Sequence, residues 1–225
     1  MQFSVMSLAS LSGYAPGVSL NAAYPRWACA YYLAFDNFSL IRMTQVRLSD
    51  FDASPFDRGA PLMLEAIWYI TKRVFFLTSI PWPSKIKCSL LRLFGARIGS
   101  GCVIKPRVNI HMPWKLFVGD DVWIGEEVFL LNLDRISIGA NCCISQRAFL
   151  CTGNHNYRIV TMPYRNEPIL VEDGAWIGAA TFIGPGVTVG REAVISAGSV
   201  LTQDASAGMV YAGNPCGIVK TRWKS

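Results

Sequence analysis

Aliphatic residues recur at every sixth position from residue 98 onward, a spacing that fits neither an α-helix nor an alternating strand. Many of them are followed directly by glycine or another small residue. The runs restart after two extra residues, and one longer interruption separates Leu150 from Val171. The positions in register are Ile98, Ile104, Ile110, Val118, Ile124, Leu130, Ile138, Ile144, Leu150, Val171, Ile177, Ile183, Val189, Ile195 and Leu201.

A sixfold repeat of this kind predicts a parallel β-helix over residues 98–206. Three short strands form one triangular coil, and the aliphatic side chain of each strand points inward and stacks on its equivalent in the next coil, roughly 4.8 Å away. Glycine and other small residues near the corners allow the backbone to bend there. The expected fold class is therefore mainly β, with about five coils by the same spacing.

The six-residue frame breaks between Leu150 and Val171. Residues 152–168 carry His, Asn, Tyr, Arg and two prolines in place of hexads. We expect this segment to leave the coil as an extruded loop. Residues 207–225 follow the last hexad, and we expect them to form a capping segment.

The segment ahead of the repeats, residues 43–97, is expected to be extended and helical. Residues 61–94 predict two short helices, broken at Pro81 and Pro83. Ile67, Ile70, Val74 and Leu77 fall near one helical face, with aromatic and basic residues interleaved. Two uses of this segment are open: packing against the prism or another subunit, and peripheral contact with a membrane surface.

Residues 1–42 mix Ser, Ala, Tyr and Gly without a sustained period, and they lack the charged start and apolar block of a signal peptide. We expect this segment to be disordered or irregular, or untranslated if synthesis begins at Met43. The chain as a whole is 52% hydrophobic and 16% charged. That balance excludes a mostly disordered protein.

The net charge and the cysteine content limit which binding partners and which cellular compartment are expected. The formal net charge of +6 suits anionic partners, but no long basic run favours nucleic acid. Seven cysteines without a CxxC spacing indicate core residues in a reducing compartment. Charged residues interrupt the apolar stretch 62–80, so no bilayer span is expected. We expect a cytoplasmic protein, placed at the inner face of the membrane if 61–94 rests there.

Five segments outside the bare repeat pattern carry a resemblance to a known family. They are LLRLFGARIG (90–99), PWKLFVGDDVWIGE (113–126), ISQRAFLCTGNHNY (144–157), EDGAWIGA (172–179) and AGNP (212–215). With these segments the chain resembles the hexapeptide-repeat acyltransferases, and within them the colanic acid biosynthesis acetyltransferases. The resemblance implies a left-handed β-helix, a homotrimer, and O-acetyl transfer from acetyl-CoA to a sugar hydroxyl in extracellular polysaccharide biosynthesis.

A histidine in the extruded loop suits that chemistry. The attacking hydroxyl must lose its proton, and neutral imidazole accepts a proton near pH 7. The chain has two histidines: His111 beside Met112 and Pro113 in a coil corner, and His155 in the polar loop. We expect His155 to be the general base. An acid or a backbone carbonyl would serve equally to hold its tautomer, and the sequence leaves that choice open.

The remaining site residues follow from the resemblance. It implies donor contacts at Trp176, a main-chain amide at Ala179 for the developing oxyanion, and Ala197 along the pantetheine arm. Lys220 and Arg222 are the nearest cations for the phosphates of coenzyme A. A trimer contact at Trp176 and a tight corner at Ala197 are equally simple interpretations.

On the acceptor side the resemblance points to Asn132 and Asp134. The alternative is a solvated turn, which Asn and Asp both favour. No metal is expected, because a zinc site of the carbonic anhydrase type would need three histidines. Two other functions stay open: an O-acetyltransferase for serine or another small acceptor, and a catalytically silent β-helix scaffold.

Overall fold

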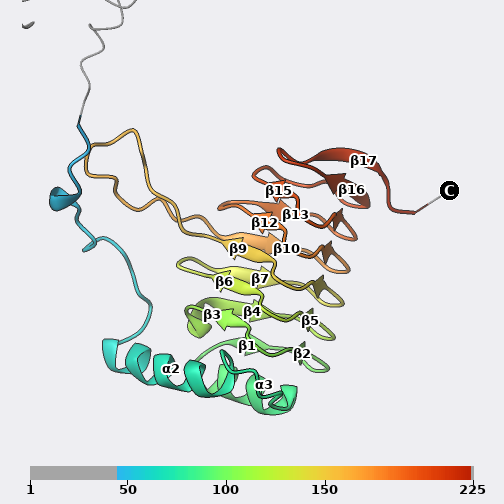
Figure 1. Ribbon diagram of the computed structural model, residues 1–225, viewed down its shortest axis with the longest axis horizontal. Coiled ribbons are helices and arrows are strands. Elements are labelled where there is room, and N and C mark those ends of the chain that lie inside the picture. Colours follow the sequence, from blue (N-terminus) through green and yellow to red (C-terminus); the bar gives the residue numbers. More distant parts are fainter. Residues whose placement is uncertain (1–44, 224–225) are drawn as a thin grey trace, which may run out of the picture. The chain divides into compact units, whose positions relative to one another are not determined.

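The computed structural model describes residues 45–223. The expectation for residues 1–42 lies outside this part of the chain. The described residues form a triangular prism of short parallel strands, with two helices at one end (Figure 1). The predicted mainly β fold, a parallel β-helix with an N-terminal helical segment, is confirmed.

Three sheets, here A, B and C, form the sides of the prism. Sheet A contains β1 (Arg97–Ile98), β4 (Leu116–Val118), β7 (Ile136–Ile138), β10 (Ile169–Val171) and β13 (Thr188–Val189). Sheet B contains β2 (Val103–Ile104), β5 (Trp123–Ile124), β8 (Cys143–Ile144), β11 (Trp176–Ile177), β14 (Val194–Ile195), β16 (Met209–Ala212) and β17 (Gly217–Thr221). Sheet C contains β3 (Asn109–Ile110), β6 (Phe129–Leu131), β9 (Phe149–Cys151), β12 (Phe182–Ile183) and β15 (Val200–Leu201).

The hexad residues form the core. Every position in register is buried except Ile98 in the first coil, which is half-buried against the same cluster. Cross-strand partners keep the register from coil to coil, as in Ile124, Ile144 and Ile177 of sheet B. Stacking of like residues thus removes a continuous apolar column from water, which is the main favourable contribution to folding.

The helices are α2 (Leu62–Phe75) and α3 (Ser84–Leu93), with one-turn helices η2 (Leu48–Asp50) and η3 (Pro113–Lys115). None of the helices within residues 45–223 is long and apolar enough to cross a bilayer. The apolar face expected from Ile67, Ile70 and Val74 is exposed. The helix instead buries Trp68, whose ring lies 5.2 Å between centroids from that of Phe76, the buried residue that follows the helix.

Side chains from the helices satisfy the open edge of the first coil. The Nζ of Lys87 is buried beneath β2 and donates to the carbonyls of Ile104 (3.2 Å) and Lys105 (2.9 Å). The amide of Ile104 donates to Ser84 Oγ at 3.0 Å. Burial lowers the pKa of Lys87, because the ammonium has lost water.

The other two sheets are closed in the same way. Arg92 donates from Nε to the Ile98 carbonyl of β1 at 3.0 Å. Trp68 donates from Nε1 to the Ile110 carbonyl of β3 at 3.1 Å. Each sheet therefore has its first strand covered, which protects edges that would otherwise pair with other chains.

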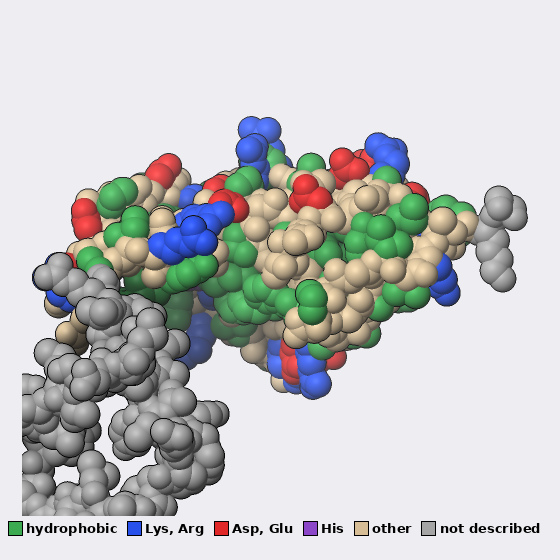
Figure 2. Space-filling model, turned by 90° about the horizontal axis from the view of Figure 1, so that it is seen from above, with side chains coloured by type: hydrophobic (Ala, Val, Ile, Leu, Met, Phe, Trp, Pro, Cys, Tyr) green, Lys and Arg blue, Asp and Glu red, His purple; other side chains and the backbone are tan. Residues whose placement is uncertain are grey.

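At the opposite end, β16 extends sheet B and β17 pairs with it in antiparallel fashion. Seen from this end, hydrophobic side chains cover the centre of the visible face and charged ones lie around its margin (Figure 2). Ile218, Val219 and Trp223 are the exposed large apolar residues of this end.

The assigned core can be tested by making the same substitution at a buried and at an exposed leucine. Leu150→Ala removes a fully buried register residue and should lower the free energy of unfolding by about 2–5 kcal/mol. Leu93→Ala makes the same chemical change at a side chain that is 77% exposed, and should cost about 0.5 kcal/mol or less. Denaturant unfolding of both variants measures the difference; equal losses would contradict the assigned core.

Candidate functional site

The segment between β9 and β10 is a hairpin-like loop that projects from the edge between sheets C and A (Figure 1). Thr152 anchors its base: the buried hydroxyl donates to the Leu131 carbonyl at 3.0 Å and accepts from the Asp134 amide at 2.9 Å. Further out, His155 and Tyr164 form an antiparallel bridge. The loop is therefore a fixed support for His155.

The imidazole of His155 is held on three sides. Its Nδ1 lies 2.6 Å from the carbonyl oxygen of Met162. Its ring centroid lies 5.0 Å from that of Tyr164 and 5.8 Å from that of Phe51, which meets it edge-on. A carbonyl only accepts hydrogen bonds, so Nδ1 carries the proton in the neutral ring and Nε2 keeps a lone pair.

Met162 is the orienting group that the sequence left open. Its backbone lies in the left-handed region, with φ of 46°, and its amide donates to the Ile159 carbonyl at 2.9 Å. A non-glycine residue held in this region is strained and is frequent at functional sites. Here the strained turn directs the Met162 carbonyl at the imidazole.

A strap formed by residues 46–61 lies against the loop. The Arg47 amide donates to the Val160 carbonyl at 2.8 Å, and the Trp114 indole donates to the Arg58 carbonyl at 2.6 Å. Phe51 and Phe56 of the strap both pack on Tyr164, with centroids 5.1 and 5.2 Å apart from it. This contact was not expected from the sequence, because the strap has no hexad, helical or motif signal.

Strap, coil and loop border a half-open cavity of about 440 Å³, the strap cavity. Aromatic faces and groups that form hydrogen bonds line it together, a combination that suits a sugar ring. Its lining residues are Asp52, Pro55, Phe56, Asp57, Trp114, Lys115, Phe117, Leu133, Asp134, Arg135, Pro163, Tyr164 and Asn166.

Of the two residues expected on the acceptor side, Asp134 lies at the strap cavity and Asn132 lies in the buried core. Asp134 lines the strap cavity. Asn132 is 0% exposed, and its amide group pairs with both the N–H (2.8 Å) and the carbonyl (2.5 Å) of Met112 in the coil below. The expectation of an acceptor contact at Asn132 does not agree with this placement, because both polar atoms of its side chain are used to hold two coils together.

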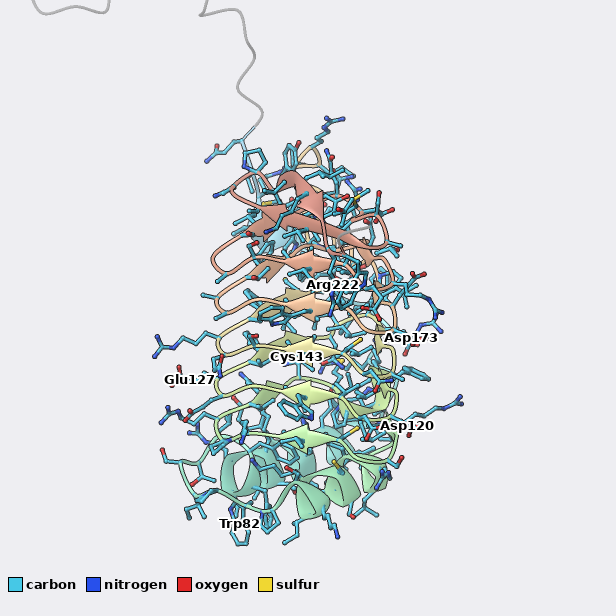
Figure 3. All side chains as sticks on the ribbon, turned by 90° about the vertical axis from the view of Figure 1, so that its right-hand side faces the viewer. Trp82, Asp120, Glu127, Cys143, Asp173 and Arg222 are labelled. Atoms are coloured by element: carbon cyan, nitrogen blue, oxygen red, sulfur yellow. The ribbon has the colours of Figure 1, made fainter. Side chains whose placement is uncertain are left out.

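The residues expected on the donor side lie along sheet B, which faces the viewer in Figure 3 with Cys143 near its middle. One outward-facing residue from each strand of this part of sheet B pairs with its equivalent on the next strand, and together they form an outward register line. In order along the prism these residues are Cys143, Trp176, Val194, Val210 and Lys220. Three strand spacings place Lys220 about 14 Å from Trp176 along the prism. Trp176 is 48% exposed, and its Nε1 donates to Ser145 Oγ at 2.9 Å.

Ala179 and Ala197 occupy successive corners between sheets B and C. The Ala179 carbonyl accepts from the Gly198 amide at 2.8 Å, whereas the Ala179 amide donates to no acceptor within the described residues. Gly178 must lack a side chain, because a Cβ there would lie 2.5 Å from the Ala197 nitrogen. The corner thus presents an amide N–H beside bare backbone.

Of Lys220 and Arg222, Lys220 is the one left exposed and without an ion pair in the described part of the chain. Arg222 binds the carbonyl of Gly174 at 2.7 Å and the carboxylate of Glu192 at 2.9 Å. Arg222 therefore braces the coils.

The described cysteines are free thiols. Burial raises the pKa of Cys142 to about 11 and also raises the pKa of Cys88, Cys102, Cys151 and Cys216. These thiols stay protonated near neutral pH and are poor nucleophiles. Within residues 45–223 no three His, Cys, Asp or Glu side chains gather as a metal site.

His155 and the donor-side residues lie on different parts of the prism. The loop leaves the edge between sheets C and A, whereas Trp176 and Lys220 face outward from sheet B. In Figure 1 the loop projects to one side and the corners of β2 and β5 to the other. His155 and the outward residues of sheet B therefore project from different sides of the prism.

Comparisons with known proteins identify the class. A model of the family described as bacterial transferase hexapeptide (six repeats) matches residues 168–203. The Escherichia coli K12 protein named "Putative colanic acid biosynthesis acetyltransferase WcaF" is 36% identical over 175 residues, which cover 78% of this chain and 96% of that protein. The galactoside O-acetyltransferase of the same strain is 27% identical, over 72% of this chain and 77% of that one.

A solved structure has the same fold. The hexapeptide-repeat acetyltransferase VCA0836 from Vibrio cholerae O1 biovar eltor, crystallised with acetyl-coenzyme A, aligns with a TM-score of 0.60 at 26% identity. The alignment covers 65% of this chain and 81% of that structure. The fold and the repeats thus define a hexapeptide-repeat acyltransferase. The chain belongs to the family of the colanic acid biosynthesis acetyltransferases, and the expected enzyme class is confirmed.

The placement of Asn132 is open to test. Asn132→Ala leaves the buried N–H of Met112 without its partner, which should lower the free energy of unfolding by about 1–3 kcal/mol. The Met112 carbonyl loses one of two donors and still accepts from the Lys115 amide at 3.0 Å. The KM for the acceptor of the folded variant should stay unchanged. Intact stability combined with a raised acceptor KM would show that Asn132 contacts substrate after all.

Proposed function

We propose that this enzyme transfers the acetyl group of acetyl-CoA to a sugar hydroxyl in extracellular polysaccharide biosynthesis, with His155 as general base. The observation that carries the proposal is the 2.6 Å contact between Nδ1 of His155 and the Met162 carbonyl, which leaves Nε2 free to accept a proton. Support for the substrates comes from the relatives, one named for colanic acid, one for galactoside O-acetylation, and one crystallised with acetyl-coenzyme A.

In this mechanism Nε2 of His155 takes the hydroxyl proton while the sugar oxygen bonds to the thioester carbonyl carbon. The same imidazolium then returns the proton to sulfur as the carbon–sulfur bond breaks. The Met162 carbonyl stabilises the imidazolium in between. The amide of Ala179, which donates to no acceptor among residues 45–223, suits the oxyanion that forms in the transition state.

The acceptor belongs in the strap cavity, with its reacting hydroxyl directed toward His155. Tyr164 lines that cavity, and its ring lies 5.0 Å from the imidazole of His155 between centroids, tilted by 32°. His155 itself is not among the lining residues, so the hydroxyl would reach it past Tyr164. Asp134 and Asn166 offer hydrogen-bonding groups to hydroxyls, while Phe56 and Trp114 offer apolar faces. Serine is a much smaller acceptor, and a cavity of about 440 Å³ favours a sugar over it.

The donor belongs along the outward register line of sheet B. The thioester would lie by Trp176 and Ala179, the pantetheine arm would pass Ala197, and the phosphates would reach Lys220. An active site assembled this way needs the loop of one chain and sheet B of another. A homotrimer supplies that arrangement, because cyclic symmetry repeats the same contact around a closed ring.

Removing the base tests the mechanism. His155→Ala should lower kcat/KM by about 10²–10⁴-fold while the protein stays folded, because the hydroxyl loses its proton acceptor. The measurement is release of coenzyme A thiol with an oligosaccharide acceptor, with serine offered in parallel. His111→Gln, the other histidine of the chain, is the control and should keep full turnover. Unchanged turnover in His155→Ala would eliminate this base.

Mixing two inactive variants tests the shared site. His155→Ala removes the base, and Ala197→Trp blocks the pantetheine path at an exposed corner. Each variant alone should be inactive, whereas co-expressed, differently tagged chains purified as mixed oligomers should regain part of the activity. Some of their sites combine an intact loop with an intact donor face. Mixed oligomers as inactive as their parents would place each site within one chain.

A further inference from the structure

The outer faces of α2 and α3 form an apolar surface, the helical base, at the end of the prism away from β17 (Figure 1). Trp68 and Leu91 face the prism and are buried, whereas Met63 (76% exposed), Ile70 (68%) and Leu93 (77%) face away from it. The exposed apolar residues of this base are Leu62, Met63, Ile67, Ile70, Val74, Ile80, Ile86 and Leu93. On each helix they recur at three-, four- or seven-residue spacing, as in Met63, Ile67, Ile70 and Val74 of α2 and Ile86 and Leu93 of α3, so each helix has one apolar outer face.

The charges of the helical base have one sign. No Asp or Glu occurs between residues 66 and 94, while Arg73 and Lys85 are exposed there. The acid just before this stretch, Glu65, is already paired with Arg58 at 2.5 Å. The surface therefore offers apolar area together with uncompensated positive charge.

Aromatic residues flank the same surface. Tyr69 is 60% exposed on α2. Trp82, between the helices, lies at the outermost end of the prism beyond the helix ribbons (Figure 3), and its Nε1 donates to the Val74 carbonyl at 3.1 Å. Apolar, aromatic and basic side chains on helices that lie flat are the combination found at lipid–water interfaces.

A second copy of the chain is a poor occupant of this surface. A twofold contact between two helical bases would place Arg73 and Lys85 of each copy against a face without a free carboxylate. Like charges brought together without partners oppose association. An anionic lipid surface has no such conflict, because its headgroups pair with the cations and its acyl region accepts the apolar side chains.

We propose that the helical base docks the enzyme on an anionic lipid membrane, with α2 and α3 lying in the interface. The prism then stands upright on the bilayer. The loop of His155 leaves the third coil, about 10 Å beyond the first coil by the strand spacing. This inference rests on the helices alone and does not depend on the chemistry proposed for His155.

Vesicle co-sedimentation of the full chain tests the proposal. Vesicles of phosphatidylcholine with phosphatidylglycerol should bind the protein, vesicles of phosphatidylcholine alone should bind it weakly, and salt should reduce the difference. Ile70→Asp should weaken binding about tenfold. Lys85→Glu should weaken it about thirtyfold, because it removes one positive charge and adds a negative one.

Matched controls come from the opposite end of the prism. Ile218→Asp and Lys220→Glu make the same changes on exposed residues of β17 and should leave vesicle binding unchanged. Circular dichroism shows that each variant is folded. Binding lost on the β17 changes instead, or absent for the wild-type chain, would overturn the proposal. A change of oligomeric state in Ile70→Asp, seen by analytical ultracentrifugation, would equally overturn it by making the base a contact between copies.

Discussion

The inward stack of aliphatic side chains sets the position of every other part of this enzyme. Each coil adds one residue from each side of the triangle to a continuous apolar column, and the parallel hydrogen bonds fix the spacing between coils. A frame of this kind leaves little freedom in its sides. Departures from the hexad pattern are therefore found at the corners, at the two ends of the prism and at the one place where the frame is broken.

The broken frame is where chemistry becomes available. Leaving the coil frees residues 152–168 from the inward and outward alternation, so polar groups can face each other across a hairpin. The strained backbone of Met162 aims a carbonyl at His155, and the strap adds Phe51 on the edge of the ring. Rigid coils below and a fixed hairpin above together hold the imidazole in one orientation.

Much of this arrangement follows from the sequence. The hexads predict the β-helix, the frame break predicts the loop, and the prolines at 81 and 83 separate the two helices. The buried face of α2 was not predictable from hydrophobicity. Trp68 is buried because its indole N–H donates to the Ile110 carbonyl at the edge of the first coil, whereas the more hydrophobic Ile70 faces outward. Such a choice depends on which backbone groups are left unpaired after the coil has formed.

The same limit applies to the candidate site. The sequence could place His155 in the loop and Asp134 at a corner, but the Met162 carbonyl and the strap residues act through backbone geometry and a distant segment. Neither leaves a pattern in the sequence. Asn132 illustrates a related limit: an asparagine at a corner gives the same sequence signal whether its amide faces a ligand or, as here, pairs with Met112 in the coil below.

The protonation of the His155 ring is the most direct test of the account, and the chain has only two imidazoles to assign. Nitrogen-15 NMR of the full protein near neutral pH, with the spectrum of His155→Gln for assignment, distinguishes the two tautomers. We predict that the neutral form of the ring carries its hydrogen on Nδ1 and has a free lone pair on Nε2. A neutral ring with hydrogen on Nε2 would contradict the hydrogen bond to Met162, and with it the role of His155 as the base.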